Sequence, residues 1–172
     1  LRRFIKREPL GVVLDIAAWN YPLLIAVNVV VPAVLAGNAV SIKHSSLTPL
    51  CGIAFEDAFK HSGAPDGLVT SLIMDHHTAE QAIQSGLIQH MAFTGSVAGG
   101  RRVKASAGNQ FIETGLELGG KDPAYIREDA NLETTIPSIM DGVFYNGGQS
   151  CCAVERIYVH ESLFDRFVAG AI

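Results

Sequence analysis

Short apolar runs alternate with longer helical segments along the first 119 residues of the chain. Each run is rich in Val, Ile, Leu or Phe and stops at turn-forming residues, as buried strands do. The runs predict strands at residues 11–16, 39–43, 68–73, 90–94 and 111–116, and the segments between them predict helices at 23–35, 48–61, 78–85 and 97–107. This alternation favours an α/β fold with a parallel sheet covered by helices on both faces.

The rhythm of the pattern changes after Gly119 and Gly120, a pair that we interpret as a domain hinge. Beyond it, the pattern predicts strands at 123–126 and 153–160 and helices at 131–145 and 161–172. We therefore expect two domains, 1–119 and 120–172. Because the chain of 172 residues begins without Met and ends inside a predicted helix, we also expect it to be a fragment of a longer protein.

Composition narrows the class of protein. Hydrophobic residues make up 48% and charged residues 17% of the chain, which excludes a disordered, strongly charged protein. The net charge of −4 offers no basic excess for nucleic acid. The longest apolar run, 23–36, is short for a membrane span and contains Asn28 and Pro32, so we expect a buried core helix there.

The three cysteines are Cys51, Cys151 and Cys152, an odd number with two neighbours. This pattern fits neither a disulfide framework nor a structural zinc site, and reduced thiols favour a cytoplasmic location. The six histidines show no metal-ligand spacing, so we predict no metal site.

The segment 146–152 is the sharpest chemical feature, because a Gly-rich turn leads directly into Cys151. Backbone N–H groups at such a turn favour a thiolate, which is the nucleophilic form of cysteine, and can hold an oxyanion. The alternative is that Cys151 and Cys152 are ordinary buried small hydrophobes.

Glu117 and Asn20 are further candidates. Glu117 stands between two leucines before paired glycines, where partial desolvation would make it a usable base; the alternative is an ion pair with Lys121. Asn20 lies at a strand-to-helix turn, where its amide can donate to an oxyanion; the alternative is a helix cap.

Two strand ends have the chemistry of a nucleotide site. The segment 93–100 follows a strand and opens a helix, where backbone N–H groups can bind a phosphate, although a plain turn explains it equally. Lys43 ends another strand at the edge where α/β sheets bind ligands, and the alternative is a solvated charge.

Taken together, these segments resemble the aldehyde dehydrogenase superfamily from about Glu8 to Ile172. The resemblance rests on the order and spacing of residues 19–22, 36–43, 93–96, 117–121 and 148–151, with the last two the most specific. Lys43 and His44, followed by small polar residues, resemble bacterial succinate-semialdehyde dehydrogenase-like members. The resemblance implies a Rossmann-like cofactor-binding domain followed by the start of a second, catalytic α/β domain.

The resemblance also implies roles. Cys151 would attack an aldehyde, Asn20 and the Cys151 N–H would hold the oxyanion, and Glu117 would activate water to hydrolyse a thioester. Cysteines 51 and 152 would be bystanders. The cofactor would be NAD or NADP, and the residues implied in its binding are Ile16, Trp19, Asn20, Lys43, Ser46, Phe93, Gly95, Ser96, Glu117, Leu118 and Gly119.

Three positions depart from the family pattern. Ala18 stands where many members have Pro, which should loosen the turn but spare Asn20. Ser46 stands where NAD-preferring members often carry Glu; a carboxylate there repels a 2′-phosphate, so Ser46 predicts that NADP is tolerated or preferred. The segment 73–77 lacks the glycines often seen near the adenine.

These implications define the expected function and its alternatives. We expect the substrate to be a small-molecule aldehyde, including a semialdehyde. We expect no nucleic acid or membrane partner. The longer protein from which the chain comes is expected to be a homodimer or homotetramer. The alternatives are cysteine-dependent esterase or acyl-transfer activity, and an inactive truncated paralogue that serves in binding or assembly. We also expect the 172 residues alone to turn over aldehyde poorly or not at all.

Overall fold

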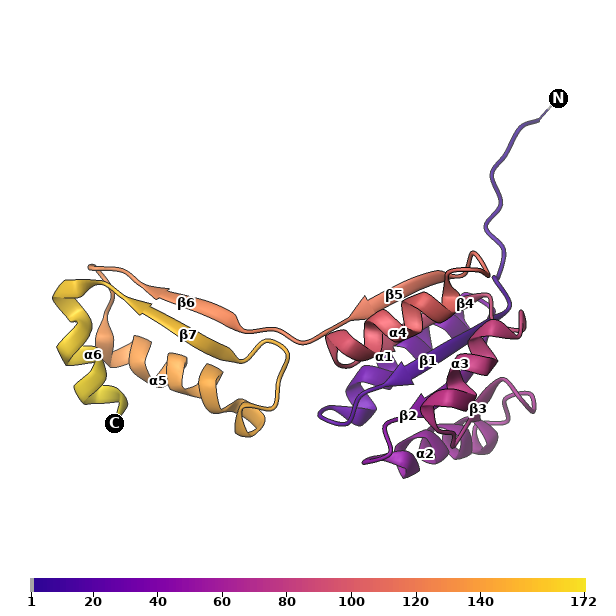
Figure 1. The fold of residues 1–172 in the computed structure, drawn as a ribbon, viewed down its shortest axis with the longest axis horizontal. Coiled ribbons are helices and arrows are strands. Elements are labelled where there is room, and N and C mark those ends of the chain that lie inside the picture. The colour runs from indigo at the N-terminus through magenta and orange to yellow at the C-terminus, as the bar shows by residue number, and fades with distance from the viewer. Residues whose placement is uncertain (1) are drawn as a thin grey trace. The chain divides into compact units, whose positions relative to one another are not determined.

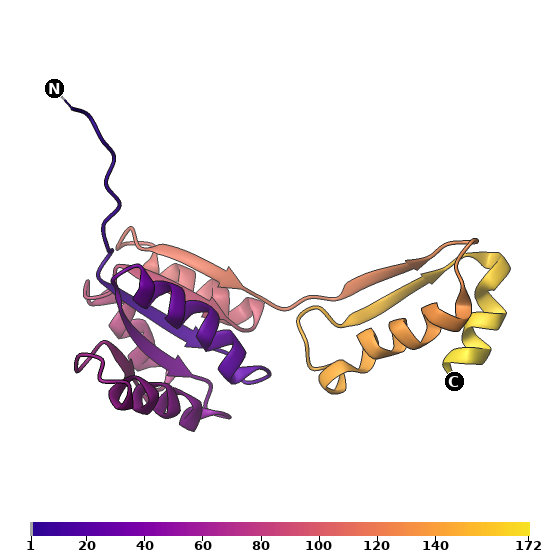
Figure 2. The same ribbon diagram turned by 180° about the vertical axis from the view of Figure 1, so that it is seen from behind.

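A computed structural model describes residues 2–172, which divide into two compact units, one ending at Leu118 and one beginning at Gly119 (Figures 1 and 2). The division lies one residue before the expected boundary. Each unit has its own hydrophobic core.

The first unit is built on five parallel strands in the order β3-β2-β1-β4-β5. They are β1 (Val12–Ala17), β2 (Ala39–His44), β3 (Val69–Ser71), β4 (His90–Thr94) and β5 (Glu113–Glu117), and the helices that connect them are α1 (Pro22–Leu35), α2 (Pro49–His61), α3 (His76–Gln84) and α4 (Val97–Ala107). The predicted α/β class with a parallel sheet is therefore confirmed.

Helices cover both faces of this sheet because the strands are apolar on both sides. On one face, Val13 and Val40 pack with Val30 of α1 and Phe55 of α2. On the other face, the core is formed by strand residues together with side chains of α3 and α4, among them Leu14, Ile16, Met91, Ile83 and Val103. The strand β1 is central, so its carboxyl end lies beside the ends of both β2 and β4.

Local sequence determines where the helices begin. Pro22 and Pro49 occupy the first turns of α1 and α2, where the missing N–H costs no hydrogen bond. Asp75 caps α3 by accepting from the Thr78 N–H at 2.8 Å. This cap starts α3 at His76, two residues before the predicted start.

Only one side of α1 is buried, which corrects the expectation of a buried core helix. Ala26 and Val30 are its buried residues, whereas Leu23, Leu24 and Leu35 are exposed. Among residues 2–172, no helix is long and apolar enough to cross a membrane.

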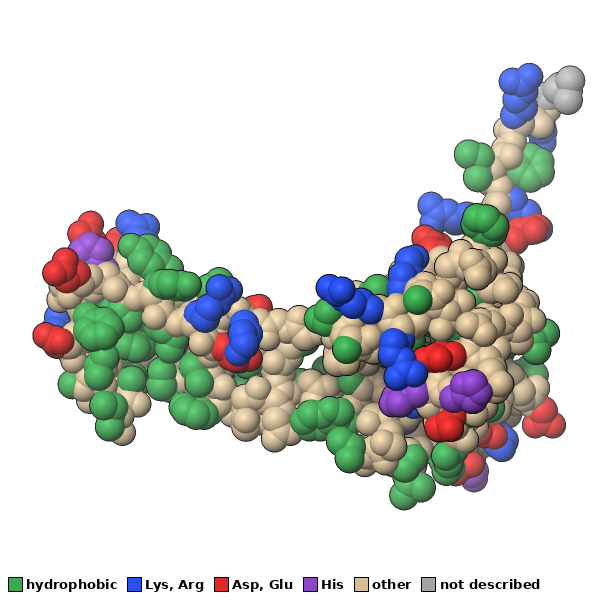
Figure 3. Space-filling view, in the orientation of Figure 1, with side chains coloured by type: hydrophobic (Ala, Val, Ile, Leu, Met, Phe, Trp, Pro, Cys, Tyr) green, Lys and Arg blue, Asp and Glu red, His purple; other side chains and the backbone are tan. Residues whose placement is uncertain are grey.

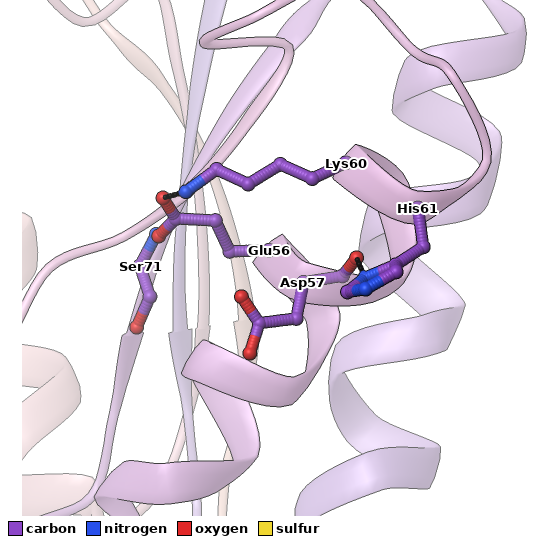
Figure 4. Close-up of polar contacts among 5 residues, drawn as sticks. All are labelled: Glu56, Asp57, Lys60, His61 and Ser71. Carbon is purple, nitrogen blue, oxygen red and sulfur yellow. Dashed lines mark hydrogen bonds and ion pairs between the residues drawn. The ribbon is translucent and has the colours of Figure 1, made fainter.

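A side chain of α2 accepts a hydrogen bond from an N–H on the free edge of β3. The Ser71 N–H donates to Glu56 Oε2 at 2.8 Å, and Lys60 Nζ lies 2.6 Å from Glu56 Oε1 (Figure 4). Beside them, His61 Nδ1 lies 2.7 Å from the Asp57 carbonyl oxygen. Lys60 and the Ser71 N–H both lower the pKa of Glu56, so the carboxylate stays ionised where the edge strand needs an acceptor.

The second unit is smaller. Its two strands, β6 (Asp122–Ile126) and β7 (Val154–Val159), pair in parallel, and α5 (Leu132–Phe144) and α6 (Phe164–Ala171) pack on them. Short 3-10 segments occupy Tyr145–Gly148 and Glu161–Leu163. Ile126, Leu132, Leu163 and Phe167 form its buried core.

Candidate active site

The polar residues singled out in the first unit lie at one edge of its sheet. Because all five strands are parallel, their carboxyl ends meet at the same edge. Asn20 follows β1, Ser46 follows β2, Gly95 follows β4 and Glu117 ends β5. The connections reverse direction between β1 and β4, which is where open α/β sheets bind ligands.

The turn after β1 holds Trp19 and Asn20. Trp19 is 44% exposed and Asn20 is half-buried. Tyr21, rather than Asn20, occupies the N-cap position of α1. The helix-cap alternative for Asn20 is therefore wrong.

The turn between β4 and α4 is shaped by glycine and supported from beneath. The Ser96 side chain caps α4 by accepting from the Gly99 N–H at 3.0 Å. A Cβ on either Gly95 or Gly99 would lie 2.8 Å from Cζ of Phe93, which is too close for two carbon atoms. The Phe93 ring is thus buried against the backbone of this turn.

The first turn of α4 has a donor set that suits an anion. An α-helix leaves its first N–H groups without helical partners and carries a partial positive charge at this end. The first turn of α4 contains no acidic residue. This helix end follows β4, which pairs with β1. Such a helix end can bind an anion such as a phosphate.

Lys43 is buried at the end of β2, so the solvated-charge alternative is wrong. It is only 5% exposed, and its Nζ donates to the His44 carbonyl oxygen at 3.3 Å. Burial lowers the pKa of the Lys43 amine, and the charge of Asp75 partly opposes this. Ser46 lies just beyond and is exposed.

Glu117 ends β5, whose outer side has no partner strand in the first unit. The Gly95 N–H donates to the Glu117 carbonyl oxygen at 3.0 Å, which joins this residue to the β4–α4 turn. Its side chain is exposed, so the predicted partial desolvation is not present. Lys121, the partner in the alternative interpretation of Glu117, forms an ion pair with Glu155 within the second unit.

Cys151 lies in the second unit, after a loop with unusual backbone geometry. Asn146, Gly147 and Gly148 have φ values of 52°, 65° and 75°, in the left-handed region that favours glycine. Cys151 and Cys152 are both exposed, so the buried-hydrophobe alternative is wrong. The Ser150 hydroxyl contacts Cys152, since its Oγ lies 3.1 Å from the sulfur of that cysteine.

The candidate residues thus divide between the units. Asn20, Lys43, Ser46, Gly95, Ser96, Glu117 and Leu118 share one sheet edge of the first unit, whereas Cys151 belongs to the second. Sequence reasoning missed two buried polar side chains near this edge, Asp15 and His44. The signal for Asp15 was present, since a carboxyl group interrupts the apolar run of β1.

Comparison with known proteins decides the family. The model of the aldehyde dehydrogenase family matches residues 2–172. The chain belongs to the aldehyde dehydrogenase family. It is 39% identical over 167 residues to an aldehyde dehydrogenase of Davidiella tassiana, covering 96% of this chain and 34% of that protein. It is also 39% identical over 165 residues to a betaine aldehyde dehydrogenase of Brucella ovis, with the same coverage of 96% and 34%.

Solved structures of aldehyde dehydrogenases agree with this assignment. The betaine aldehyde dehydrogenase of Staphylococcus aureus in complex with NAD+ superposes with a TM-score of 0.92 at 32% identity, covering 96% of this chain and 33% of that one. The succinic semialdehyde dehydrogenase of Streptococcus pyogenes in complex with NADP+ has a TM-score of 0.92 at 30% identity, covering 95% and 36%. The chain therefore spans about a third of the length of these aldehyde dehydrogenases.

Proposed function

We propose that the protein carrying this chain oxidises an aldehyde to the carboxylic acid with NAD or NADP. Membership of the aldehyde dehydrogenase family supports this, and the observation that carries the proposal is the placement of Asn20 and Glu117 at one sheet edge together with an exposed Cys151. In this proposal, residues up to Gly119 belong to the cofactor-binding domain and residues from 120 onward begin the catalytic domain.

The cofactor would lie along the carboxyl edge of the first unit. The first turn of α4, with Gly95 and Ser96, would hold the pyrophosphate, and Lys43 and Ser46 would hold the adenosine ribose. Ile16, Trp19, Phe93, Leu118 and Gly119 would shape the remainder of the site. When bound, NAD or NADP accepts a hydride.

The chain's own residues would carry the other steps. The Cys151 thiolate attacks the aldehyde carbon, and the resulting oxyanion is held by the Asn20 amide and the Cys151 N–H. Loss of a hydride from this thiohemiacetal leaves a thioester on Cys151. Glu117 takes a proton from water, which attacks the thioester and releases the acid and the Cys151 thiolate.

Replacement of Cys151 tests the nucleophile, and its neighbour supplies a matched control. In the intact protein, we expect Cys151→Ala to lower aldehyde-dependent NAD(P)H formation by about 10³-fold or more. Cys152→Ala removes another exposed thiol one residue away and should leave the rate within a few-fold of wild type. Equal losses in the two variants would remove the basis for assigning Cys151.

Glu117→Gln separates thioester formation from its hydrolysis. We expect a burst of NAD(P)H that stops near one equivalent per active site, because acylation proceeds and deacylation does not.

Hydrolysis of an activated ester without cofactor, combined with no aldehyde-dependent NAD(P)H, would favour the esterase or acyl-transfer alternative instead. Cofactor binding without either turnover would favour the binding or assembly paralogue.

The substrate, the oligomeric state and the cellular location of the intact protein are also proposed. Its substrate would be a small-molecule aldehyde, with a semialdehyde among the first to be screened because of the Lys43-His44 pattern. The intact protein would act as a homodimer or homotetramer. Three free cysteines support a cytoplasmic location.

A further inference from the structure

Cys151 and Cys152 are neighbours in the chain, and both are exposed. The Ala153 N–H donates to the Ser150 carbonyl oxygen at 3.3 Å, so these four residues form a tight turn with the cysteines at its two central positions. The third cysteine, Cys51, lies on α2 in the first unit and is only partly exposed. The turn therefore brings two of the three thiols of the chain to one place.

The backbone of this turn is packed against the segment that leads into β6. A Cβ on Gly120 would collide with the carbonyl oxygen of Cys151, which belongs to the peptide group joining the two cysteines. One residue after them, the Ala153 carbonyl oxygen accepts from the Asp122 N–H at 3.2 Å. The turn is thus anchored through its backbone, while both cysteine residues stay exposed.

Ser150 orients the second thiol. Its Oγ lies 3.1 Å from the sulfur of Cys152, and it also accepts from the Cys152 N–H at 3.4 Å. Because the oxygen is the acceptor for this N–H, the hydroxyl proton is available to the sulfur. The hydroxyl can therefore donate to the Cys152 sulfur when that sulfur acts as a nucleophile.

The proposed function, on which this step rests, makes Cys151 the thiol that meets small electrophiles. A sulfur that an aldehyde reaches is also reached by a hydroperoxide of similar size, and a thiolate reacts with hydroperoxides to give a sulfenic acid. Further oxidation gives a sulfinic acid, which ordinary thiols do not reduce. A second thiol that condenses with the sulfenic acid stops the oxidation at a reversible stage.

We propose that Cys151 and Cys152 form a redox-modification site for hydroperoxides, in which Cys152 is the resolving thiol that protects Cys151 from irreversible oxidation. The Cys151 thiolate attacks the hydroperoxide, the O–O bond breaks, and the displaced oxygen takes a proton to leave as an alcohol or as water. The Cys152 thiolate then attacks the sulfur of the sulfenic acid, which forms the S–S bond and displaces hydroxide, released as water after protonation. Two thiols are oxidised by two electrons, and the O–O bond accepts them.

The spacing of neighbouring residues makes this S–S bond easy to reduce. Adjacent Cα atoms lie about 3.8 Å apart across a trans peptide, which is shorter than the roughly 4.4–6.8 Å of ordinary disulfides. A disulfide outside that range is strained and more reducible, as labile and regulatory disulfides are. Two molecules of a small thiol return both cysteines to the reduced form and are themselves joined as a disulfide.

The test treats the intact protein with hydrogen peroxide, blocks the remaining free thiols, and measures the mass of the peptide that holds both cysteines. In wild type, we expect this peptide to lose two hydrogens and to regain both thiols with dithiothreitol. Cys152→Ser removes the resolving thiol at nearly constant size, so Cys151 should instead gain two oxygens that dithiothreitol does not remove. Cys51→Ser, which removes the thiol of the first unit, is the matched control and should behave as wild type.

The same mass measurement, followed over time, tests the role of Ser150. Ser150→Ala should slow formation of the disulfide severalfold and divert part of Cys151 to the sulfinic acid. Ser150→Thr keeps a hydroxyl and should form the disulfide at close to the wild-type rate. Equal rates in Ser150→Ala and wild type would overturn the orienting role of the hydroxyl.

Two mass results would overturn the proposed site. One is an oxidised wild-type peptide in which Cys152 remains a free thiol, and the other is full recovery of the Cys151 thiol in Cys152→Ser. Aldehyde-dependent NAD(P)H formation is followed in the same samples, and it should return with dithiothreitol in wild type but not in Cys152→Ser. A reversible disulfide in a protein without this activity would support the redox site and reject the proposed function, whereas full activity without the disulfide would do the opposite.

Discussion

Asp15 interrupts an otherwise apolar strand, and its ionisation determines the sign of one pH effect on stability. Its pKa rises from 3.8 to about 8 on folding, so between these values the folded state holds a proton that the unfolded state has released. The contribution of the protonated Asp15 carboxyl to the free energy of unfolding is therefore complete below about pH 4, and it is lost as the pH rises through about 8. His44 acts in the opposite direction: because its pKa is lowered, its contribution is present above 6.5 and is lost as the pH falls.

The first residue-scale prediction concerns this loss. Asp15→Asn should flatten the decline in the free energy of unfolding between about pH 6 and pH 8, because the amide does not ionise. A shift of this size corresponds to a total on the order of 5 kcal/mol over the whole window, at about 1.36 kcal/mol per pKa unit. Urea midpoints at several pH values measure it, and Asp57→Asn is the surface control. An unchanged slope in Asp15→Asn would contradict the assignment.

The second residue-scale prediction concerns cofactor choice. Ser46 is exposed beside Lys43 and has no charge to repel a 2′-phosphate. Ser46→Glu in the intact protein should lower the NADP/NAD ratio of kcat/KM by about tenfold or more, because a carboxylate repels the phosphate and accepts from ribose hydroxyls. Ser46→Gln has a similar shape without the charge and should change the ratio much less. An unchanged NADP/NAD ratio in the glutamate variant would contradict the proposed role of Ser46.

Between the elements of the second unit, a close approach of two backbone segments explains why glycine is needed at one of two adjacent positions. A Cβ on Gly120 would collide with the Cys151 carbonyl oxygen, so the segment before β6 and the cysteine loop touch through their backbones. A Cβ on Gly119 would meet nothing within 4 Å. The pair that marks the hinge in the sequence therefore has two different physical roles.

This contrast predicts unequal effects of the same substitution. Gly120→Ala should lower stability by about 1–3 kcal/mol, because the loop must move to admit the methyl group, and it should lower kcat more than tenfold. Gly119→Ala should be close to wild type in both thermal unfolding and rate. Equal effects at the two positions would show that the approach to Cys151 is not what requires glycine.

At the scale of the whole molecule, both units expose apolar side chains. A groove of about 490 Å³ between α1 and α2 is lined by Leu23, Leu24, Val27, Ala54, Phe55 and Ala58. Phe164 and Val168 are exposed on α6, and Figure 3 shows hydrophobic side chains on the side of this helix that faces the viewer. These surfaces give a physical reason for the low charged fraction of 17%.

The corresponding prediction concerns residues 1–172 on their own. They span about a third of the length of the relatives and leave apolar surface exposed, so we expect them to bind a hydrophobic dye and to produce no measurable NAD(P)H with aldehyde. The intact protein, assayed in parallel, should be active. Clear NAD(P)H production by the 172 residues would contradict this expectation.

Most elements could be predicted from the amino-acid pattern, with some shifts at their ends. Local periodicity and turn residues predict β4 at 90–94 and α4 at 97–107 with their observed bounds, because both signals lie within the element itself. The segments around Glu117 and Cys151 carry the resemblance to the aldehyde dehydrogenase family, and the family model that matches residues 2–172 confirms it.

Features that depend on pairing between distant segments could not be predicted from the local pattern. The strand order β3-β2-β1-β4-β5, the parallel pairing of β6 with β7, and the approach of Gly120 to Cys151 join segments that lie far apart in the sequence. The exposure of Glu117 follows from the edge position of β5, and the burial of Asp15 and His44 follows from two helices packed over neighbouring strands. Periodicity indicates which face of an element is apolar, but register and strand order determine which side chains meet across it.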